Sequence, residues 1–430
     1  MAHQASKNSN MPHWYGAGLE HVWLPYAQMK TVTPPLPVAR TLGARIVLTD
    51  GRELIDGIAS WWTACHGYNH PHIRRVVEEQ LASMPHVMFG GLAHEQALRL
   101  ARRLAALMPG DLTHVFFSDS GSVAIEVAIK MATQFWINRG SPRKTQFIAF
   151  KNGYHGDTTG AMALSDPEAS MHAMFAGLLP KHKITDLPED EAALAALEKV
   201  LVDTDGTIAG IVIEPLVQGA GGMKFHDAAV LRCLRALADK YEALLIFDEI
   251  FTGFGRTGTL FAFEQAQIVA DIITLSKALT GGTLPLAATI ASRKVFDAFC
   301  SDDQDKALMH GPTYMANALA CAAANASLDL FEQEPRMRQV AGIERALERG
   351  LAPCRHLPSV KDVRVKGAIG VVELDRINDL NGLRARFIEE GVFIRPIGNI
   401  IYLTPAFTIA DDELKTLTDA VVRVVKGLAR

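Results

Sequence analysis

Three short apolar runs in the middle of the chain are each followed at once by ionisable side chains. Ile208–Ile213 precedes Glu214, Leu244–Phe247 precedes Asp248 and Glu249, and Ile272–Leu275 precedes Ser276 and Lys277. One such residue after an apolar strand is unremarkable. In an open α/β sheet, however, ligands bind just beyond the carboxyl ends of the strands. Acids and a lysine at three successive strand ends therefore predict a shared site.

A lysine and a carboxylate at one sheet edge suit the chemistry of pyridoxal phosphate. The aldehyde of this cofactor forms a Schiff base with a lysine, and a carboxylate keeps its pyridine nitrogen protonated. Lys277 and Asp248 are the candidates for these two roles. Taken singly, Lys277 is also compatible with a lysine that extends its amine into solvent, and Asp248 with a helix N-cap.

A phosphate site is predicted at Ser118–Ser122, between the expected strand His114–Phe117 and a helix that begins near Val123. Backbone N–H groups at a helix start, with serine hydroxyls beside them, form an anion site. The alternative is an ordinary helix cap with a tight glycine turn. The segment lacks the G-x-S-x-G pattern, so a hydrolase nucleophile is not indicated.

The elements that must position these residues alternate between helices and strands. We expect helices at 73–84, 95–108, 122–136, 189–201, 227–241 and 317–330, with further strands at 114–117 and 147–150. Such alternation predicts an α/β fold with a mostly parallel sheet covered on both faces. The predicted domains are a large one over residues 72–330 and a smaller α+β one built from residues 1–71 and 331–430. Asp50-Gly51 predicts a hairpin between the runs 44–49 and 53–58.

The composition excludes several functional classes. The 430 residues are 49% hydrophobic with a net charge of -4, which argues against nucleic acid or anionic membrane as a partner. No apolar run approaches the ~18 residues of a membrane span. The five cysteines contain no C-x-x-C pair, and the histidines near residue 70 lack a helical metal spacing, so we expect reduced thiols, a cytoplasmic protein and no metal. Residues 1–15 are polar and are expected to be unanchored.

The strand-end segments LLIFDEIFTGFGRTG and DIITLSKALTGG resemble the signature of the class III pyridoxal-phosphate aminotransferases. This class has the aspartate aminotransferase-like fold, known as fold type I. Within the class, the Trp61-Trp62 pair, NGYHGDTTGAM and the segment Met309–Thr313 resemble the branch that serves biotin biosynthesis. The resemblance extends from about His21 to the C-terminus.

The resemblance implies roles for individual residues. Lys277, Asp248 and Tyr26 are the expected catalytic residues. Cofactor binding is expected from Gly121, Ser122, Tyr154, Asp248, Lys277, Pro312, Thr313 and Glu214. Substrate binding is expected from Trp61, Tyr154, Gly311, Arg395, Lys277 and Tyr402, with Asp157 as a weaker candidate. Arg256 is either the electrostatic partner of Glu214 or a structural arginine.

The implied reaction transfers the amino group of S-adenosylmethionine to 8-amino-7-oxononanoate, giving 7,8-diaminononanoate in two half-reactions. Thr313 would reach the phosphate from a second subunit, so the resemblance implies a homodimer. The alternative is a class III aminotransferase whose donor is lysine, a diamine or an ω-amino acid. A nicotinamide oxidoreductase would require a glycine fingerprint followed by an acid, and this is absent in the right context. A non-catalytic protein of the same fold would predict loss of the lysine or the acid, and both are present.

Overall fold

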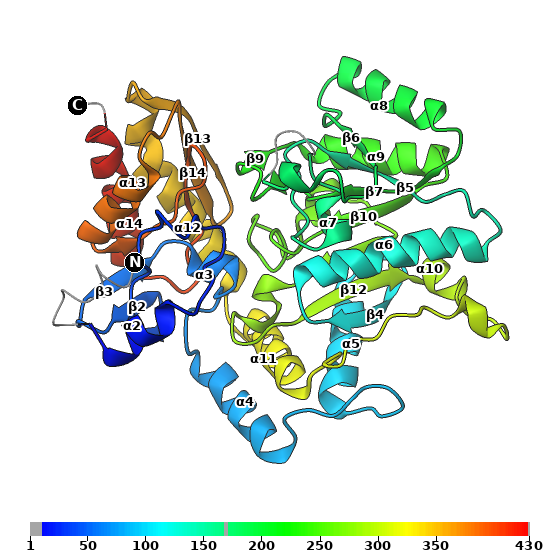
Figure 1. The fold of residues 1–430 in the computed structure, drawn as a ribbon, viewed down its shortest axis with the longest axis horizontal. Helices are drawn as coiled ribbons and strands as arrows, with labels where there is room; N and C mark the ends of the chain where they lie inside the picture. Colours follow the sequence, from blue (N-terminus) through cyan, green and yellow to red (C-terminus); the bar gives the residue numbers. More distant parts are fainter. Residues whose placement is uncertain (1–10, 167–170, 429–430) are drawn as a thin grey trace.

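The computed structural model describes residues 11–166 and 171–428, and its centre is a seven-stranded sheet (Figure 1). In spatial order the strands are β4 (Leu112–Ser118), β12 (Ala287–Ser292), β11 (Ile272–Leu275), β10 (Leu244–Asp248), β7 (Ile208–Ile213), β5 (Gln146–Phe150) and β6 (Lys183–Thr185). Only β12 within this sheet runs antiparallel to its neighbours. The predicted mostly parallel sheet is therefore confirmed.

Strand β12 was not predicted. Its sequence, AATIAS, is short and rich in alanine, so it lacks the β-branched and aromatic residues that mark a strand. All six residues are nevertheless buried, because β12 is enclosed between β4 and β11. Tertiary packing rather than local preference makes this segment a strand.

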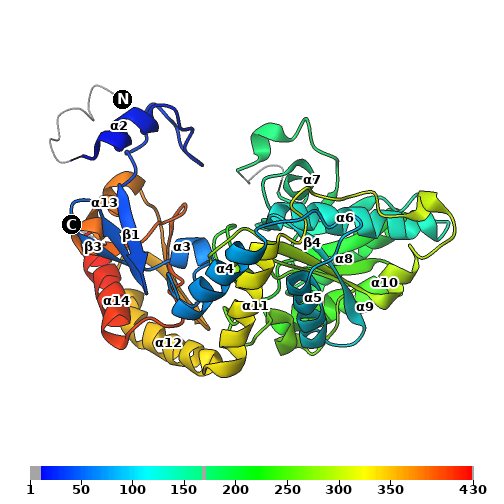
Figure 2. The same ribbon diagram turned by 90° about the horizontal axis from the view of Figure 1, so that it is seen from below.

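Helices cover both faces of the central sheet (Figure 2). Alternate strand residues point to opposite faces, so Ile211 and Leu245 belong to one apolar core while Val212 and Ile246 belong to the other. Helix α6 (Gly121–Asn138) packs on the second core. The helices on the first core are α5 (Glu95–Leu107), α8 (Glu191–Asp203), α9 (Ala228–Lys240) and α11 (Ala318–Gln333).

The two ends of the chain meet beside this unit (Figure 1). Strands β1 (Val38–Leu42), β2 (Arg45–Leu48) and β3 (Glu53–Asp56) form a sheet whose fourth strand is β15 (Val392–Phe393), which is parallel to β3. The hairpin predicted at Asp50-Gly51 is confirmed by the antiparallel pairing of β2 with β3. Proposed domain limits at residues 71 and 330 stay predictions.

The remaining C-terminal elements complete this smaller unit. A second sheet contains β13 (Val360–Lys366), β14 (Ile369–Leu374) and β16 (Ile400–Leu403), and the helices are α12 (Arg336–Leu351), α13 (Leu380–Glu389) and α14 (Asp411–Lys426). The other elements are mostly short: α2 (His13–Leu19), α4 (Pro71–Ser83), α7 (Thr159–Met162), α10 (Arg293–Asp297), β8 (Val217–Gln218) and β9 (Lys224–Phe225).

The prediction that residues 1–15 are unanchored is wrong for Tyr15. Residues 1–10 lie outside the described residues. Tyr15, however, is buried within α2 and donates its hydroxyl hydrogen to the carbonyl of Pro35. An aromatic residue with a polar tip anchors this helix, although the flanking sequence is polar.

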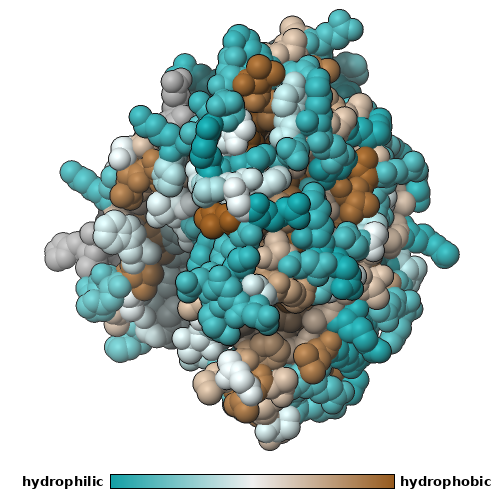
Figure 3. All heavy atoms as spheres, turned by 90° about the vertical axis from the view of Figure 1, so that its right-hand side faces the viewer, coloured by the Kyte–Doolittle hydropathy of each residue, from teal (hydrophilic) through white to brown (hydrophobic). Residues whose placement is uncertain are grey.

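The outer face of the larger unit is mainly hydrophilic. Figure 3 shows it with hydrophobic side chains only in small, separate patches. Over the described ranges, no helix combines the length and the apolar character that crossing a membrane requires.

Candidate active site

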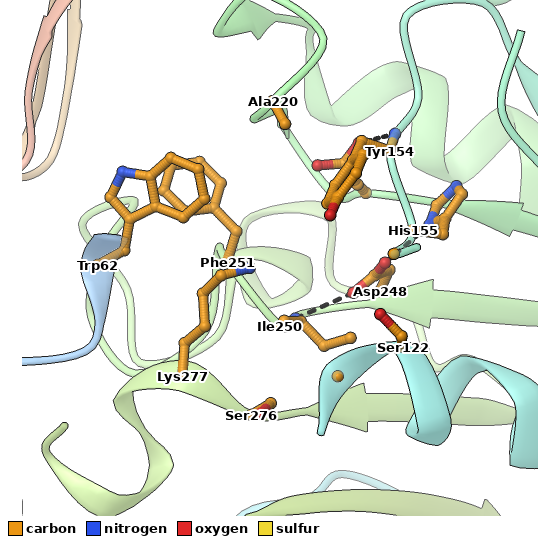
Figure 4. Close-up of a pocket in the computed structure, with 13 residues that line it drawn as sticks. Trp62, Ser122, Tyr154, His155, Ala220, Asp248, Ile250, Phe251, Ser276 and Lys277 are labelled. Atoms are coloured by element: carbon orange, nitrogen blue, oxygen red, sulfur yellow. Dashed lines mark hydrogen bonds and ion pairs between the residues drawn. The ribbon is translucent and has the colours of Figure 1, made fainter. Parts of the chain in front are cut away.

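The carboxyl ends of β7, β10 and β11 meet at one cavity of about 200 Å³ (Figure 4). Glu214, Asp248 and Lys277 all line it, as their places at three strand ends predicted. The start of α6 supplies Gly121 and Ser122, and the loop after β5 supplies Tyr154 and His155. The other lining residues are Trp62, Gly156, Ala220, Ile250, Phe251 and Ser276.

Lys277 begins a short 3-10 turn directly after β11. Its Nζ lies 5.0 Å from the centre of the Trp62 ring, and the side chain lines the cavity. Burial lowers the pKa of Lys277, while the carboxylates of Asp248, Glu214 and Asp157 act in the opposite direction. A lowered pKa increases the fraction of neutral amine, the form that attacks an aldehyde.

Asp248 is buried and held from two sides. Its Oδ2 accepts a hydrogen bond from Nδ1 of His155 at 2.7 Å, and its Oδ1 accepts one from the backbone N–H of Ile250 at 3.1 Å. Burial acts to lower the pKa of His155, but Asp248 and Glu214 outweigh it and raise that pKa. The contact with His155 therefore fixes the direction of the Asp248 carboxylate.

His155 was missed at the level of sequence. It lies between Tyr154 and Gly156 in a loop, and only the folded sheet brings it to Asp248, 93 residues further along the chain. The available signal was a histidine beside the predicted Tyr154, in a segment that had to reach the same strand ends.

Glu214 fastens two loops at the site. Its Oε1 accepts a hydrogen bond from the N–H of Tyr154 at 2.9 Å, and its Oε2 accepts one from the N–H of Gly219 at 2.8 Å. Burial raises the pKa of Glu214 to about 7, with the charge of Asp248 adding to the rise and that of His155 opposing it. The predicted role of Glu214 in cofactor binding stays a prediction.

The start of helix α6 lies against the loop that carries Tyr154 and His155. Ser122 Oγ accepts a hydrogen bond from the N–H of Asp157 at 3.1 Å. Gly156 has a φ of 128°, and a Cβ there would lie 2.1 Å from Ser122 Oγ, so only glycine permits this approach. The first N–H groups of a helix have no partner within the helix, and the first two residues of α6, Gly121 and Ser122, line the cavity.

These features fit pyridoxal phosphate. One cavity holds a partly buried lysine with a lowered pKa, a fixed carboxylate, an aromatic side chain and the N-terminus of an 18-residue helix. The helix start suits a phosphate, and Asp248 suits a protonated ring nitrogen. Lys277 suits the aldehyde.

A left-handed turn at residues 59–62 (α3) presents the two tryptophans to different surroundings. The φ angles of Ala59, Ser60, Trp61 and Trp62 are 45°, 49°, 53° and 71°. Left-handed backbone costs about 1–2 kcal/mol per residue that is not glycine. Trp62 is buried against Phe251 and Lys277, whereas Trp61 is 37% exposed. Trp62 was missed because only this backbone determines which tryptophan faces the lysine.

Trp61, Arg395 and Tyr26 form an outer wall beside the cavity. The Arg395 guanidinium carbon lies 5.4 Å from the centre of the Trp61 ring, and the Tyr26 ring meets Trp61 edge-on at 6.2 Å. Within the described residues, Arg395 makes no ion pair. An unpaired guanidinium beside aromatic rings is suited to binding a carboxylate.

Tyr26, Tyr154 and Asp157 are joined by hydrogen bonds. Tyr154 donates to Asp157 Oδ1 at 3.0 Å, Tyr26 donates to Asp157 Oδ2, and the two tyrosine hydroxyls lie 3.2 Å apart. Burial, and then Tyr26 and Asp157, raise the pKa of Tyr154. Tyr26 is 60% exposed and does not line the cavity around Lys277. Tyr402 is buried, with its ring centre 6.0 Å from that of Trp62.

Three predicted residues are not brought to the cavity by their own chain. Gly311, Pro312 and Thr313 follow Met309, whose carbonyl accepts a hydrogen bond from Lys130, and none of the three lines the cavity. Their predicted roles stay predictions.

Arg256 proves to be a structural arginine. It donates hydrogen bonds to the carbonyls of Pro405 at 2.9 Å and Ala368 at 3.3 Å, and its guanidinium lies 4.6 Å from the Phe407 ring centre. Across the described parts of the chain it forms no ion pair with Glu214, so that alternative is wrong. Burial lowers the pKa of Arg256 to about 10.

The sheet, the lysine and the carboxylate held by His155 are those of a fold type I pyridoxal-phosphate transaminase. A family model described as aminotransferase class-III matches residues 26–425. The chain belongs to this family.

Within this family, the chain is similar to proteins with more specific names. An adenosylmethionine-8-amino-7-oxononanoate aminotransferase from Buchnera aphidicola subsp. Acyrthosiphon pisum is 45% identical over 409 residues, covering 94% of this chain and 95% of the relative. The crystal structure of the enzyme of that name from Methanocaldococcus jannaschii has a TM-score of 0.89 at 31% identity, over 95% of this chain and 97% of the other. A pyridoxal-phosphate-bound amine transaminase from an uncultivated Pseudomonas species has a TM-score of 0.87 at 31% identity, over 95% and 99%.

Proposed function

We propose that the protein transfers the amino group of S-adenosylmethionine to 8-amino-7-oxononanoate, with pyridoxal phosphate as cofactor, as a step in biotin biosynthesis. The observation that carries the substrate assignment is the unpaired Arg395 beside Trp61 and close to the cavity of Lys277. A substrate with a carboxylate and a long aliphatic chain fits a cation set among aromatic rings. The 45% identity to an enzyme of this name, over nearly the whole chain, supports the same assignment.

The residues divide the work of the reaction. Bound pyridoxal phosphate supplies an electron-accepting ring, which stabilises negative charge at the substrate carbon that carries the amino group. Asp248, held by His155, would pair with the protonated ring nitrogen. Lys277 would hold the aldehyde, and its amine, when free, would accept the proton of the substrate carbon and return it during the transfer.

The surrounding side chains orient the reactants. Tyr154, tied through its N–H to Glu214, places an aromatic face against the cavity. Trp62 and Phe251 pack together on the opposite side, with the Trp62 ring beside the Lys277 amine (Figure 4). These rings give the Lys277 amine an apolar boundary on that side.

The proposal includes a homodimer with shared sites. Thr313, Pro312 and Gly311 would reach the phosphate and substrate of the partner subunit. Support comes from their absence from the cavity of their own chain and from the exposure of Met309 and Tyr314 beside them, at 78% and 59%. We expect a Thr313→Ala protein to stay dimeric but to bind the cofactor more weakly, as measured by titration of the bound absorption band.

The deciding experiment treats the cofactor-loaded protein with S-adenosylmethionine alone and follows the absorption band of the lysine-bound cofactor. Conversion of the band to that of the aminated cofactor supports the proposed donor. If lysine, a diamine or an ω-amino acid converts the band and S-adenosylmethionine does not, the reaction class stands and the donor assignment is wrong. A Lys277→Ala protein, which cannot form the band, is the control.

A further inference from the structure

The left-handed turn that carries Trp61 and Trp62 is organised by one buried carboxylate. Asp56, the last residue of β3, is only 1% exposed. Its Oδ1 accepts the N–H of Ile58 at 2.8 Å, and its Oδ2 accepts the N–H of Ser60 at 2.9 Å. The hydroxyl of Tyr68 donates to the same Oδ2 at 2.6 Å. Three donors from three directions therefore surround one side chain.

These hydrogen bonds explain how four consecutive left-handed residues persist without a glycine among them. Residues 59–62 occupy a backbone region that L-residues avoid, so the surrounding structure must hold them there. Asp56 binds the N–H groups at the entrance and first turn of this segment. Tyr68 donates its one hydroxyl hydrogen to the carboxylate, and its oxygen lies 2.8 Å from Ser60 Oγ, which can donate its own hydrogen to it. Hydrogen bonds thus hold both the backbone of this segment and the side chain of Ser60.

The direction of the turn sets two parts of the site at once. Trp62 faces Lys277, and Trp61 faces Arg395. Asp56 is paired with Phe393 in the sheet, and Arg395 follows Phe393 by two residues. The carboxylate therefore lies where β3, which leads into the tryptophan turn, runs beside β15, which leads to Arg395.

We propose that Asp56 is a positioning residue of the substrate site, with Tyr68 as its partner, and that it acts through the left-handed turn on Trp61. The effect of Trp61 on substrate rests on the proposed function, whereas the effect of Asp56 on the turn does not. A purely structural Asp56 would instead change stability and total activity without a preference for substrate binding.

The first test compares Asp56→Asn with the parent as cofactor-loaded enzyme. The amide keeps the size of the side chain but replaces one acceptor with a donor facing Ser60 and Tyr68, so the turn loses its hold. We expect KM for the carboxylate substrate to rise about tenfold or more with a smaller change in kcat, the pattern of lost substrate binding. The absorption band of the lysine-bound cofactor should keep its full amplitude.

Asp50→Asn is the matched control. Asp50 belongs to the same hairpin, is exposed, and accepts a hydrogen bond from the N–H of Arg52, two residues on, at 3.0 Å. This substitution should leave KM unchanged. If Asp56→Asn does not fold, Tyr68→Phe removes one donor and keeps the carboxylate, and a smaller rise in KM is expected.

A double-mutant cycle with Trp61→Phe separates positioning from general destabilisation. If Asp56 acts through Trp61, adding Asp56→Asn to Trp61→Phe should raise KM by no more than about twofold. An effect as large as in the parent background overturns the proposal.

Hydrogen exchange tests the turn independently of catalysis. In Asp56→Asn, the amides of Ile58 and Ser60 should exchange at least about tenfold faster than in the parent, while those of β10 are unchanged. Unchanged exchange at Ile58 and Ser60 would overturn the role of Asp56 even if the substrate assignment stood. If exchange is faster in Asp56→Asn but the parent protein is inactive on both proposed substrates, the role of Asp56 in the turn stands and the proposed function is wrong.

Discussion

The two sides of the active site are built in different ways. Glu214, Asp248 and Lys277 stand at the ends of regular, fully buried strands. Trp61 and Arg395 stand on irregular backbone from the two ends of the chain, and Trp61 is exposed. The groups assigned to the reaction are thus fixed by a rigid sheet, and those assigned to substrate choice are fixed by loops. Substitutions on the two sides should therefore have different kinetic signatures.

The largest effect is expected from Lys277→Ala. Loss of the amine removes both the attachment of the aldehyde and the proton carrier, so turnover should fall by at least about 10⁴-fold, the upper range for a proton-transfer group. The fold should persist, as measured by thermal unfolding. Lys183→Ala on β6 is a matched change at an exposed site of the same sheet and should retain activity. Substantial turnover by Lys277→Ala would refute the assignment of the reaction side.

A second prediction concerns the stability that is lost because Glu249, a carboxylic acid at a strand end, is buried. Burial raises the pKa of Glu249 from 4.5 to about 7, despite hydrogen bonds from Thr252 and Phe263. The protonated form is therefore favoured in the fold, so its stabilising contribution is present below pH 4.5 and is lost as pH rises to about 7.

Glu249→Gln imitates the protonated acid at every pH. Between pH 4.5 and about 7, the parent should lose about 3 kcal/mol more unfolding free energy than the variant, at 1.4 kcal/mol per pH unit of pKa change. Urea unfolding at pH 5 and pH 8 measures this difference. Parallel pH profiles of the two proteins would contradict the expected protonation.

A third prediction addresses the support of Asp248. His155→Asn should lower turnover roughly 10- to 100-fold, the range seen when the outer hydrogen-bonding partner of a ligand group is removed. The cofactor should also bind more weakly, as followed by its absorption during dialysis. His114→Asn is the control, because His114 stacks on Phe296 at 3.7 Å and does not line the cavity. If the two substitutions lower turnover equally, the prediction that His155 supports Asp248 is wrong.

The smallest effect is expected on the outer wall. Arg395→Lys keeps the charge but loses the planar two-donor geometry, so KM for the carboxylate substrate should rise about tenfold with little change in kcat. Steady-state kinetics with each substrate varied in turn measures this. A fall in kcat at constant KM would place Arg395 on the reaction side and erase the distinction between the two sides.

The same division explains what the sequence alone could predict. Glu214, Asp248 and Lys277 were found because an apolar run followed by an ionisable residue marks a strand end. His155 and Trp62 were not found, because the first depends on a contact across 93 residues and the second on the hand of the backbone. Strand β12 was missed because its small residues have no strand preference of their own. Roles that depend on a second subunit, such as that of Thr313, stay predictions.

The pairing of β3 with β15 also orders events during synthesis. Asp56 and its neighbour Phe393 lie at opposite ends of the chain, so at typical rates of translation β3 waits on the order of 20–60 s for its partner. All seven strands of the central sheet are complete by Ser292, well before β15 is made. We therefore expect the nascent chain to acquire its lysine-bearing edge first and its substrate wall last. Ribosome-arrested chains ending at residue 380 should resist proteolysis in the central sheet but not near Trp61.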